Sequence, residues 1–395
     1  MKRVARLAWA LLLFPLAAGA AEEMKLPKMS SKERKEHLRR ARIWEPVDVS
    51  SRDLYNGPAG EPDIAVDQEV TCDFIPKPMG GWSRKFYCRL NDGKIYKVKY
   101  EHGGRYKEAY GEVLGTRLFW ALGFYADRML PVRVTCRGCP KDPWKYVRER
   151  KARHHLDDEG NIRSLPPEAE VGTHTYDPAA IEIKLDAEEI RHRKDQGWSW
   201  KSLKRVDETL GGATKAETDA LKLLMAFVQD ADNKYKQNTL ACPRKELVKD
   251  DAGKVTCRRP VMYVDDLGSV FGKGGFTTGY EGRVDYDAWK ERAVWRDRDD
   301  CKARLAAIGG ILRVSTLRDP TVGEEGRALL ARQLGQLSDK QIADLFRAAR
   351  IERLHQTMSD GASGRREVTI QDWVELFKKK RDEITKHPGC GRDDD

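Results

Sequence analysis

The stretch Gln229-Asp230-Ala231-Asp232-Asn233-Lys234-Tyr235-Lys236-Gln237-Asn238 decides the fold, together with Met262-Tyr263-Val264-Asp265-Asp266-Leu267-Gly268. Phosphoryl transfer from a nucleotide needs a carboxylate beside the acceptor hydroxyl, with an amide soon after it, and a second carboxylate for the metal that bridges the phosphates. Asp232 followed by Gln237 or Asn238 fits the first requirement, and Asp266 after a short apolar strand fits the second. Asp-rich loops are common, so the order of the two segments carries more information than either segment alone.

A lysine and a glutamate that lie upstream strengthen this interpretation. Asn91-Asp92-Gly93 predicts a tight hairpin turn between strands over 85–90 and 94–100, because these residues tolerate positive φ. Lys97 and Lys99 share one face of the second strand. Apolar residues at helical spacing then run up to Gly123, and Glu112 lies on this predicted helix. Protein kinases pair a strand lysine with such a glutamate to fix the lysine against the nucleotide phosphates; a solvated Lys/Glu surface is the simpler alternative.

A short glycine segment precedes the hairpin. Gly80, Gly81 and Ser83 lie between two predicted strands, where the lack of a Cβ lets backbone N–H groups approach phosphates. The segment is neither a Walker loop nor a full kinase glycine motif. An ordinary hairpin loop explains it equally well.

The first twenty residues predict a secretory signal peptide. Met1-Lys2-Arg3 is basic, residues 7–16 are apolar, and Ala18-Gly19-Ala20 is a small-residue cleavage site. We therefore expect an exported protein, periplasmic or secreted, that is cleaved near Ala20. No other stretch of the sequence is long and apolar enough to cross a bilayer.

Eight cysteines in an exported chain make disulfides the default expectation. Cys72 and Cys88 lie on predicted strands that flank the glycine segment, and Cys242 and Cys257 bracket a polar turn, so each pair is placed to join. Cys136-Arg137-Gly138-Cys139 resembles half of a zinc knuckle, but no typical second half follows in the sequence.

The formal net charge of +10 favours anionic partners, such as a nucleotide or an acidic acceptor. Nucleic acid is disfavoured, because the chain is predicted to be exported and its Lys and Arg residues are scattered among many Asp and Glu. No Gly-x-Ser-x-Gly or His-Glu-x-x-His motif indicates a hydrolase.

The predicted organisation has five parts. Residues 1–20 form the signal peptide, 21–61 a charged and largely flexible leader with one helix over 30–42, and 62–135 a β-rich lobe that ends with a strand over 131–134. Residues 136–385 form a mostly helical lobe that begins with a Gly/Pro-rich crossing over 136–144 and an irregular segment over 145–200. Residues 386–395 form a flexible tail. Thr214-Lys215-Ala216-Glu217 predicts a capping box at the start of a helix with a buried stripe.

At these residues the chain resembles the atypical branch of the protein-kinase-like superfamily, which includes HipA-type kinases and type II phosphatidylinositol 4-kinases. It looks closest to exported bacterial proteins that share the pieces 112–127, 131–134, 232–234 and 265–268. The resemblance covers about residues 70 to 360. It implies an α+β fold of the bilobal protein-kinase-like kind, with a small β-rich N-lobe containing one helix and a larger, mostly helical C-lobe.

The resemblance also implies a role for each site residue. Lys99, or Lys97 as the alternative, would contact the phosphates of ATP or another nucleotide, Glu112 would pair with the lysine, and Asp232 would be catalytic. Asp266, with Gln237 or Asn238, would hold Mg²⁺ or Mn²⁺. The acceptor would be a hydroxyl of a protein, lipid or glycan.

Two departures from the family pattern keep an alternative open. Kinases usually place Asn five residues after the catalytic Asp, where this chain has Gln237, and the Arg that often surrounds that Asp is missing. The alternative is an inactive kinase-like scaffold in the periplasm. Asp230 and Asp265 lie close enough in sequence to exchange roles with Asp232 and Asp266.

Overall fold

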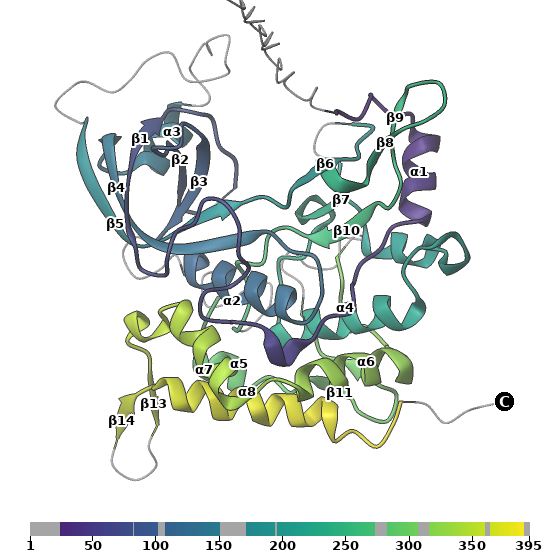
Figure 1. Ribbon diagram of the computed structural model, residues 1–395. Helices are drawn as coiled ribbons and strands as arrows, with labels where there is room; N and C mark the ends of the chain where they lie inside the picture. The colour runs from purple at the N-terminus through teal and green to yellow at the C-terminus, as the bar shows by residue number, and fades with distance from the viewer. Residues whose placement is uncertain are drawn as a thin grey trace, which may run out of the picture.

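The computed structural model describes residues 24–81, 83–101, 107–150, 171–193, 196–272, 283–306, 316–359 and 364–390. The predicted signal peptide and the end of the predicted tail lie outside these ranges. The structure is a mixed α+β fold, as predicted. Figure 1 shows the largest group of strands at one end of the molecule and helices of the C-terminal half along the opposite side.

Five strands form a closed barrel in the order β1-β2-β3-β5-β4. They are β1 (Glu69–Ile75), β2 (Lys85–Arg89), β3 (Ile95–Tyr100), β4 (Arg128–Pro140) and β5 (Val171–Ile183). Parallel pairing of β1 with β4 closes the barrel, and the other neighbours are antiparallel. The predicted β2–β3 hairpin is confirmed: Gly93 has a φ of +78°, and Lys85 pairs with Lys99.

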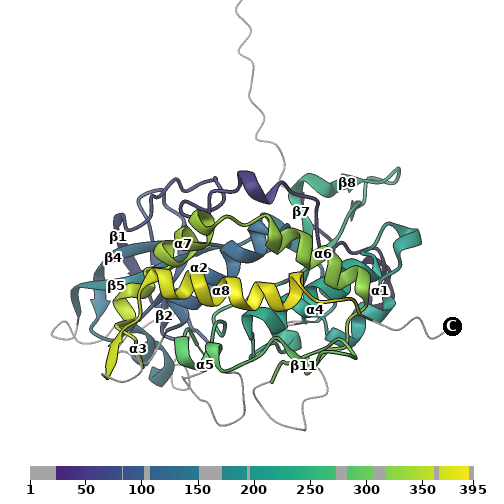
Figure 2. The same ribbon diagram turned by 90° about the horizontal axis from the view of Figure 1, so that it is seen from below.

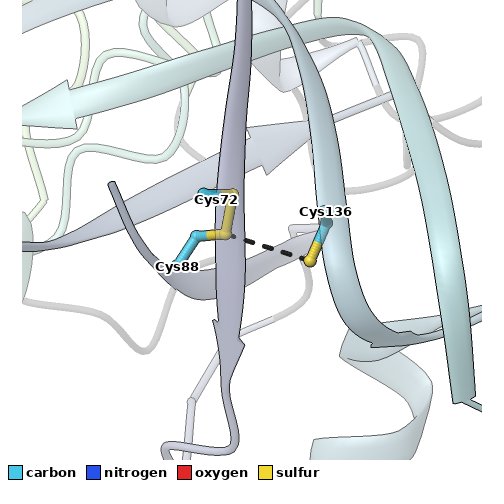
Figure 3. Close-up of side chains that lie close together, drawn as sticks. All are labelled: Cys72, Cys88 and Cys136. Carbon is cyan, nitrogen blue, oxygen red and sulfur yellow. Dashed lines mark hydrogen bonds between the residues drawn. A yellow bond between two sulfur atoms is a disulfide. The ribbon is translucent and has the colours of Figure 1, made fainter. Parts of the chain in front are cut away.

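Two disulfides lie together in the apolar interior of the barrel. Cys72–Cys88 joins β1 to β2, as predicted, and Cys136–Cys139 closes within β4. The Cys88 and Cys136 sulfurs lie 3.9 Å apart (Figure 3). The Cys-x-x-Cys segment is therefore a disulfide rather than half of a zinc site. Cys242–Cys257, also predicted, and Cys301–Cys390 complete the set.

Strands β4 and β5 correct two predictions. β4 continues to Pro140, through the segment that was predicted to be a crossing, and β5 occupies part of the segment that was predicted to be irregular. Most of β5 pairs with β3 or β4, so distant residues fix it. The barrel thus includes strands beyond residue 135, although the division into lobes stays a prediction.

Most of the helices pack around one large core. Figure 2 shows α8 running across the face seen from below, next to α6 and α7. The larger helices of this core are α2 (Glu108–Ala121), α4 (Lys215–Val228), α6 (Glu324–Gly335), α7 (Asp339–Ala348) and α8 (Ile370–Thr385), with the shorter α5 (Tyr286–Lys290). The short helix α3 (Pro143–Arg150) packs in the barrel core instead. The predicted capping box at Thr214 and Glu217 is present at the start of α4. Aromatic rings from four elements meet in the core, among them Phe227, Trp289, Phe346 and Phe377.

Short strands complete the structure. A three-stranded sheet has the order β10-β7-β6, and its strands are β6 (Ala187–Glu189), β7 (Asn238–Pro243) and β10 (Val261–Val264). Three two-stranded pairs are β8 (Leu247–Lys249) with β9 (Val255–Cys257), β11 (Trp295–Asp297) with β12 (Lys302–Ala303), and β13 (Thr357–Ser359) with β14 (Arg365–Glu367). Among the described residues, no helix combines the length and the apolar character needed to span a membrane.

The prediction of a largely flexible leader is wrong for residues 24–61. Helix α1 (Ser31–Arg39) matches the predicted helix, but the chain after it is also packed: Ile43, Val49 and Leu54 are buried in the main core. Arg117 of α2 donates a hydrogen bond to the Leu54 carbonyl oxygen over 2.9 Å. Charged residues dominate the composition of this segment and obscure the few apolar residues that anchor it.

Candidate functional site

Lys99 on β3 and Glu112 on α2 form a buried ion pair. The Lys99 and Glu112 side chains are almost fully buried, with 4% and 1% of their surfaces exposed, respectively. The side chains of Val98 and Tyr100 point into the barrel interior. Because successive side chains of a strand point to opposite faces, Lys99 points to the outer face of the barrel, where it meets Glu112 of α2. The predicted lysine–glutamate pair is thus present in space.

Asp266 brings a second carboxylate to the same lysine. It follows β10, and its Oδ1 lies 3.6 Å from the Lys99 Nζ. Burial opposes ionisation of Asp266, but Lys99 and neighbouring lysines hold the pKa of this carboxyl well below its usual range. Asp266 and Glu112 raise the pKa of the Lys99 ammonium in spite of its burial. The Asp266 side chain keeps 37% of its surface exposed, so it remains open to a ligand.

Gln237 joins Asp266 to Asp232. Its Nε2 lies 3.0 Å from Asp232 Oδ2 and 3.3 Å from Asp266 Oδ2, so one amide group bridges the two carboxylates. The Asp232 carboxylate also forms an ion pair with Lys234, 2.7 Å away. Lys99, Glu112, Asp232, Gln237 and Asp266 therefore form one connected cluster, although they come from four separate segments.

Buried neighbours hold the loop that carries Asp232. Asn233 is fully buried: its Nδ2 donates to the Asp230 carbonyl over 2.8 Å, and its Oδ1 accepts from the Leu317 N–H over 2.7 Å. The indole of Trp200 donates to the Asn233 carbonyl. Asp230 is also fully buried, and burial, reinforced by the nearby Asp232 and Asp266 charges, raises its pKa well above the usual value. The geometry thus separates Asp230, which supports the loop, from the partly exposed Asp232.

Three polar residues near the Lys99 cluster in sequence have their hydrogen-bond or ion-pair partners outside it. Lys97 pairs with Glu182 of β5 at 2.6 Å. The Asn238 amide is buried in β7 and donates to the Trp198 carbonyl over 2.9 Å, so the structure does not bring it to the cluster. Asp265 accepts from Thr239 and lies 3.5 Å from Lys184. The roles predicted for Lys97 and Asn238 therefore receive no geometric support.

The glycine segment lies beside the lysines. Gly80, Gly81 and Ser83 are in the connection from β1 to β2. Gly81 has a φ of +85°, and a Cβ at this position would lie 3.2 Å from the Lys85 Nζ. Gly80 is open to solvent and Ser83 is buried. The phosphate contacts predicted for these residues stay a prediction.

Sequence reasoning missed several contributors. Lys85 shares the outer face with Lys99, and burial followed by repulsion from Lys99 lowers its pKa. The hairpin turn fixes the register that places it there, so the sequence did contain this signal. Lys234 was given no role in the site, but its ammonium contacts the Asp232 carboxylate.

Two glycines of α2, also missed, allow the close approach of the Asp266 segment. A Cβ on Gly111 would lie 2.4 Å from the Gly268 carbonyl oxygen, and a Cβ on Gly115 would lie 2.6 Å from the Leu267 Cβ. Neither position could carry a side chain without a shift of backbone. Their four-residue spacing could have indicated a close packing face on the helix.

The solved structures that resemble this chain, described below, are distant from it in sequence. No family model matches the chain, and no curated protein matches its sequence. Among solved structures, a proinflammatory kinase of Helicobacter pylori, CtkA, is similar with 10% identity and a TM-score of 0.39, covering 81% of this chain and 95% of its own. The Golgi casein kinase with Mn/ADP bound is similar with 10% identity and a TM-score of 0.37, covering 89% and 84%. These scores are too low to support an argument about function.

Proposed function

We propose that this chain is an exported phosphotransferase of the bilobal kinase-like kind, which uses a nucleotide and a divalent metal to modify a hydroxyl acceptor. The observation that carries the proposal is the buried Lys99 held between Glu112 and Asp266. Burial of a charged lysine is costly unless carboxylates pair with it. A cation fixed in this way beside an open carboxylate suits the phosphate groups of a nucleotide.

The donor set fits a hard divalent cation in part. Mg²⁺ and Mn²⁺ prefer oxygen ligands, and the Asp266 and Asp232 carboxylates supply them. Gln237 directs its NH₂ group to both carboxylates and uses its Oε1 to accept from the Lys234 N–H. Assignment of amide O and N follows the hydrogen bonds, so Gln237 would serve as a ligand only after its amide turned over. When bound, the metal would neutralise the charge that develops on the phosphates.

The chain's own residues would perform the remaining tasks. Lys99 would hold the phosphates, and Glu112 would fix the direction of the lysine. Asp232 would orient the acceptor hydroxyl and take its proton, while Lys234 keeps the Asp232 carboxylate in place through their ion pair. The connection that contains Gly80 and Gly81 would cover the phosphates. The acceptor is a protein, lipid or glycan hydroxyl.

One observation favours the alternative, a non-catalytic scaffold. The Gln237 amide occupies the space between the two carboxylates and satisfies both without a metal. A scaffold would keep this arrangement and bind an anionic partner without turnover.

Formation of ADP from ATP with Mg²⁺ or Mn²⁺ tests the proposal. Asp232→Asn keeps the size of the side chain and removes the base, so we expect turnover to fall by about 100-fold or more while nucleotide affinity is kept. ADP formation that is unchanged in Asp232→Asn would contradict the role of Asp232. Nucleotide binding without turnover in the unmodified chain would favour the scaffold.

A further inference from the structure

A cavity lies apart from the Lys99 cluster, where the N-terminal segment meets the β10-β7-β6 sheet. Its volume is about 410 Å³, which is within the range of small-molecule sites. Arg42 forms an isolated bridge with Val261 of β10, so the cavity is built on the segment that anchors the leader. Figure 1 shows β6, β7 and β10 side by side in this region.

The floor of the cavity is apolar. Tyr125, Leu185 and Val261 line it and belong to one small hydrophobic cluster. Val261 is buried, whereas Tyr125 and Leu185 are only partly buried and so offer surface to a ligand. A planar or aliphatic group would find contacts here that water does not provide.

Three cations line the same cavity: Arg42, Lys245 and Arg259. Within the part of the chain that the structure describes, none of the three makes an ion pair or a side-chain hydrogen bond. Lys245 and Arg259 are exposed at the rim, and Arg42 is partly buried. Their donors are therefore available to an anion.

The carboxylates of the cavity are already engaged. Glu45 accepts from the Tyr125 hydroxyl over 2.6 Å. Asp186 pairs with Arg244 at 3.0 Å, and Glu246 pairs with Arg258 at 2.8 Å. Arg244 also pairs with Glu188 at 2.8 Å, so with the outer partners included five cations face four carboxylates and one positive charge is in excess.

We infer that this cavity binds a small organic anion, with its carboxylate or phosphate on Arg42, Lys245 and Arg259 and its apolar body on Tyr125, Leu185 and Val261. Charge-assisted hydrogen bonds from arginine and lysine suit both kinds of anion. The site does not depend on the proposed phosphotransfer activity, because it shares none of the residues of the Lys99 cluster.

Ligand-observed NMR on the oxidised chain at low ionic strength tests the inference. The probes are phenyl phosphate and benzoate, which combine an anion with an apolar ring. Inorganic phosphate supplies the charge alone and benzyl alcohol supplies the ring alone. We expect at least one of the two combined probes to bind, and both single-feature probes to bind more weakly.

Variants locate the binding. Lys245→Gln with Arg259→Gln removes two exposed cations without disturbing the core, and we expect the affinity of the bound probe to fall at least about tenfold. Leu185→Trp fills the cavity and should also weaken binding. Arg332→Gln, on α6, is the matched control and should leave the affinity unchanged.

Two results would overturn the inference. One is the absence of binding by both phenyl phosphate and benzoate. The other is binding that persists unchanged in the double variant and in Leu185→Trp, since the probe would then occupy another site, such as the Lys99 cluster.

Discussion

Lys99 is the residue on which the site depends. Its ammonium is buried, and the carboxylates of Glu112 and Asp266 balance its charge. Removal of one partner of a buried ion pair leaves an unpaired charge, which costs more than removal of both partners. Stability and the proposed binding of a nucleotide therefore depend on the same side chain.

This asymmetry gives a prediction for the ion pair. Lys99→Met should lower the free energy of unfolding by about 3 kcal/mol, because Glu112 is left buried beside the Asp266 carboxylate. Adding Glu112→Gln removes that charge and should restore part of the loss, which denaturant unfolding of the two variants measures. Equal stability of Lys99→Met and the unmodified chain would show that the pair is not buried as described.

Individual site residues were predictable to different degrees. Asp232, Asp266, Lys99 and Glu112 stood in recognisable local patterns, and the structure brings them together. The separation of Asp232 from Asp230 was not predictable, because it depends on burial by distant residues such as Trp200 and Leu317.

At the scale of elements, α2 is positioned by its two glycines. In a helix interior, alanine is more favourable than glycine by about 1 kcal/mol of helix propensity. At Gly115, however, a Cβ would lie 2.6 Å from the Leu267 Cβ, closer than two carbons can approach without a shift. The clash therefore outweighs the gain in helix propensity.

Gly115→Ala should lower the melting temperature and weaken nucleotide binding, because it moves the Asp266 segment away from Lys99 and Glu112. Gly335→Ala, at the end of α6, is the matched control, since a Cβ there meets nothing within 4 Å. The control should be neutral or stabilising by up to about 1 kcal/mol. Equal behaviour of the two variants in thermal unfolding would refute the packing argument.

The connection from β5 to β6 contains a pH-dependent contact. Asp127 accepts hydrogen bonds from the Lys184 ammonium and the Leu185 N–H, and burial raises its pKa to about 6. The native state therefore holds a proton that the unfolded state, with an ordinary pKa, has already lost. The Asp127 contribution to stability falls as the pH rises from about 4 to 6.

Asp127→Asn should remove this pH dependence of the free energy of unfolding, which amounts to a change on the order of 1–3 kcal/mol between about pH 4 and 6. The measurement is the difference in the free energy of unfolding between the variant and the unmodified chain from pH 4 to 7. A difference that does not change with pH would mean that Asp127 does not bind a proton in this range.

Elements with local signals were predictable, and elements fixed by distant pairing were not. The β2–β3 hairpin follows from Asn91-Asp92-Gly93, and α2 follows from its apolar spacing and Gly123. β5 lacks such signals, because its partners β3 and β4 lie far away in sequence.

The N-terminal segment and the disulfides link parts of the molecule that are far apart in sequence. Residues 41–54 pass through the main core, and Cys301–Cys390 ties the C-terminal segment back across 89 residues. The composition of the leader suggested flexibility, because composition does not reveal where a few apolar residues pack. The eight cysteines, by contrast, correctly predicted a disulfide-bonded chain.

Loss of Cys301–Cys390 should destabilise the protein more than loss of Cys242–Cys257. The two bonds span 89 and 15 residues, and the loss of loop entropy in the unfolded chain corresponds to about 4–5 and about 3 kcal/mol. Paired Cys→Ser variants compared in denaturant measure this order. A reversed order would show that the native contacts of the shorter loop dominate.

The most direct test of the central claim is thermal unfolding of the oxidised chain with ATP or ADP and Mg²⁺ or Mn²⁺, beside Asp266→Ala. A ligand that binds only the native state stabilises it, by about 2.7 kcal/mol at 100 times its Kd. We predict a metal-dependent rise in melting temperature that Asp266→Ala abolishes. The matched control Asp265→Asn, whose side chain faces Lys184 and Thr239, should keep the rise. No rise with any nucleotide, or a rise that survives in Asp266→Ala, would contradict the account.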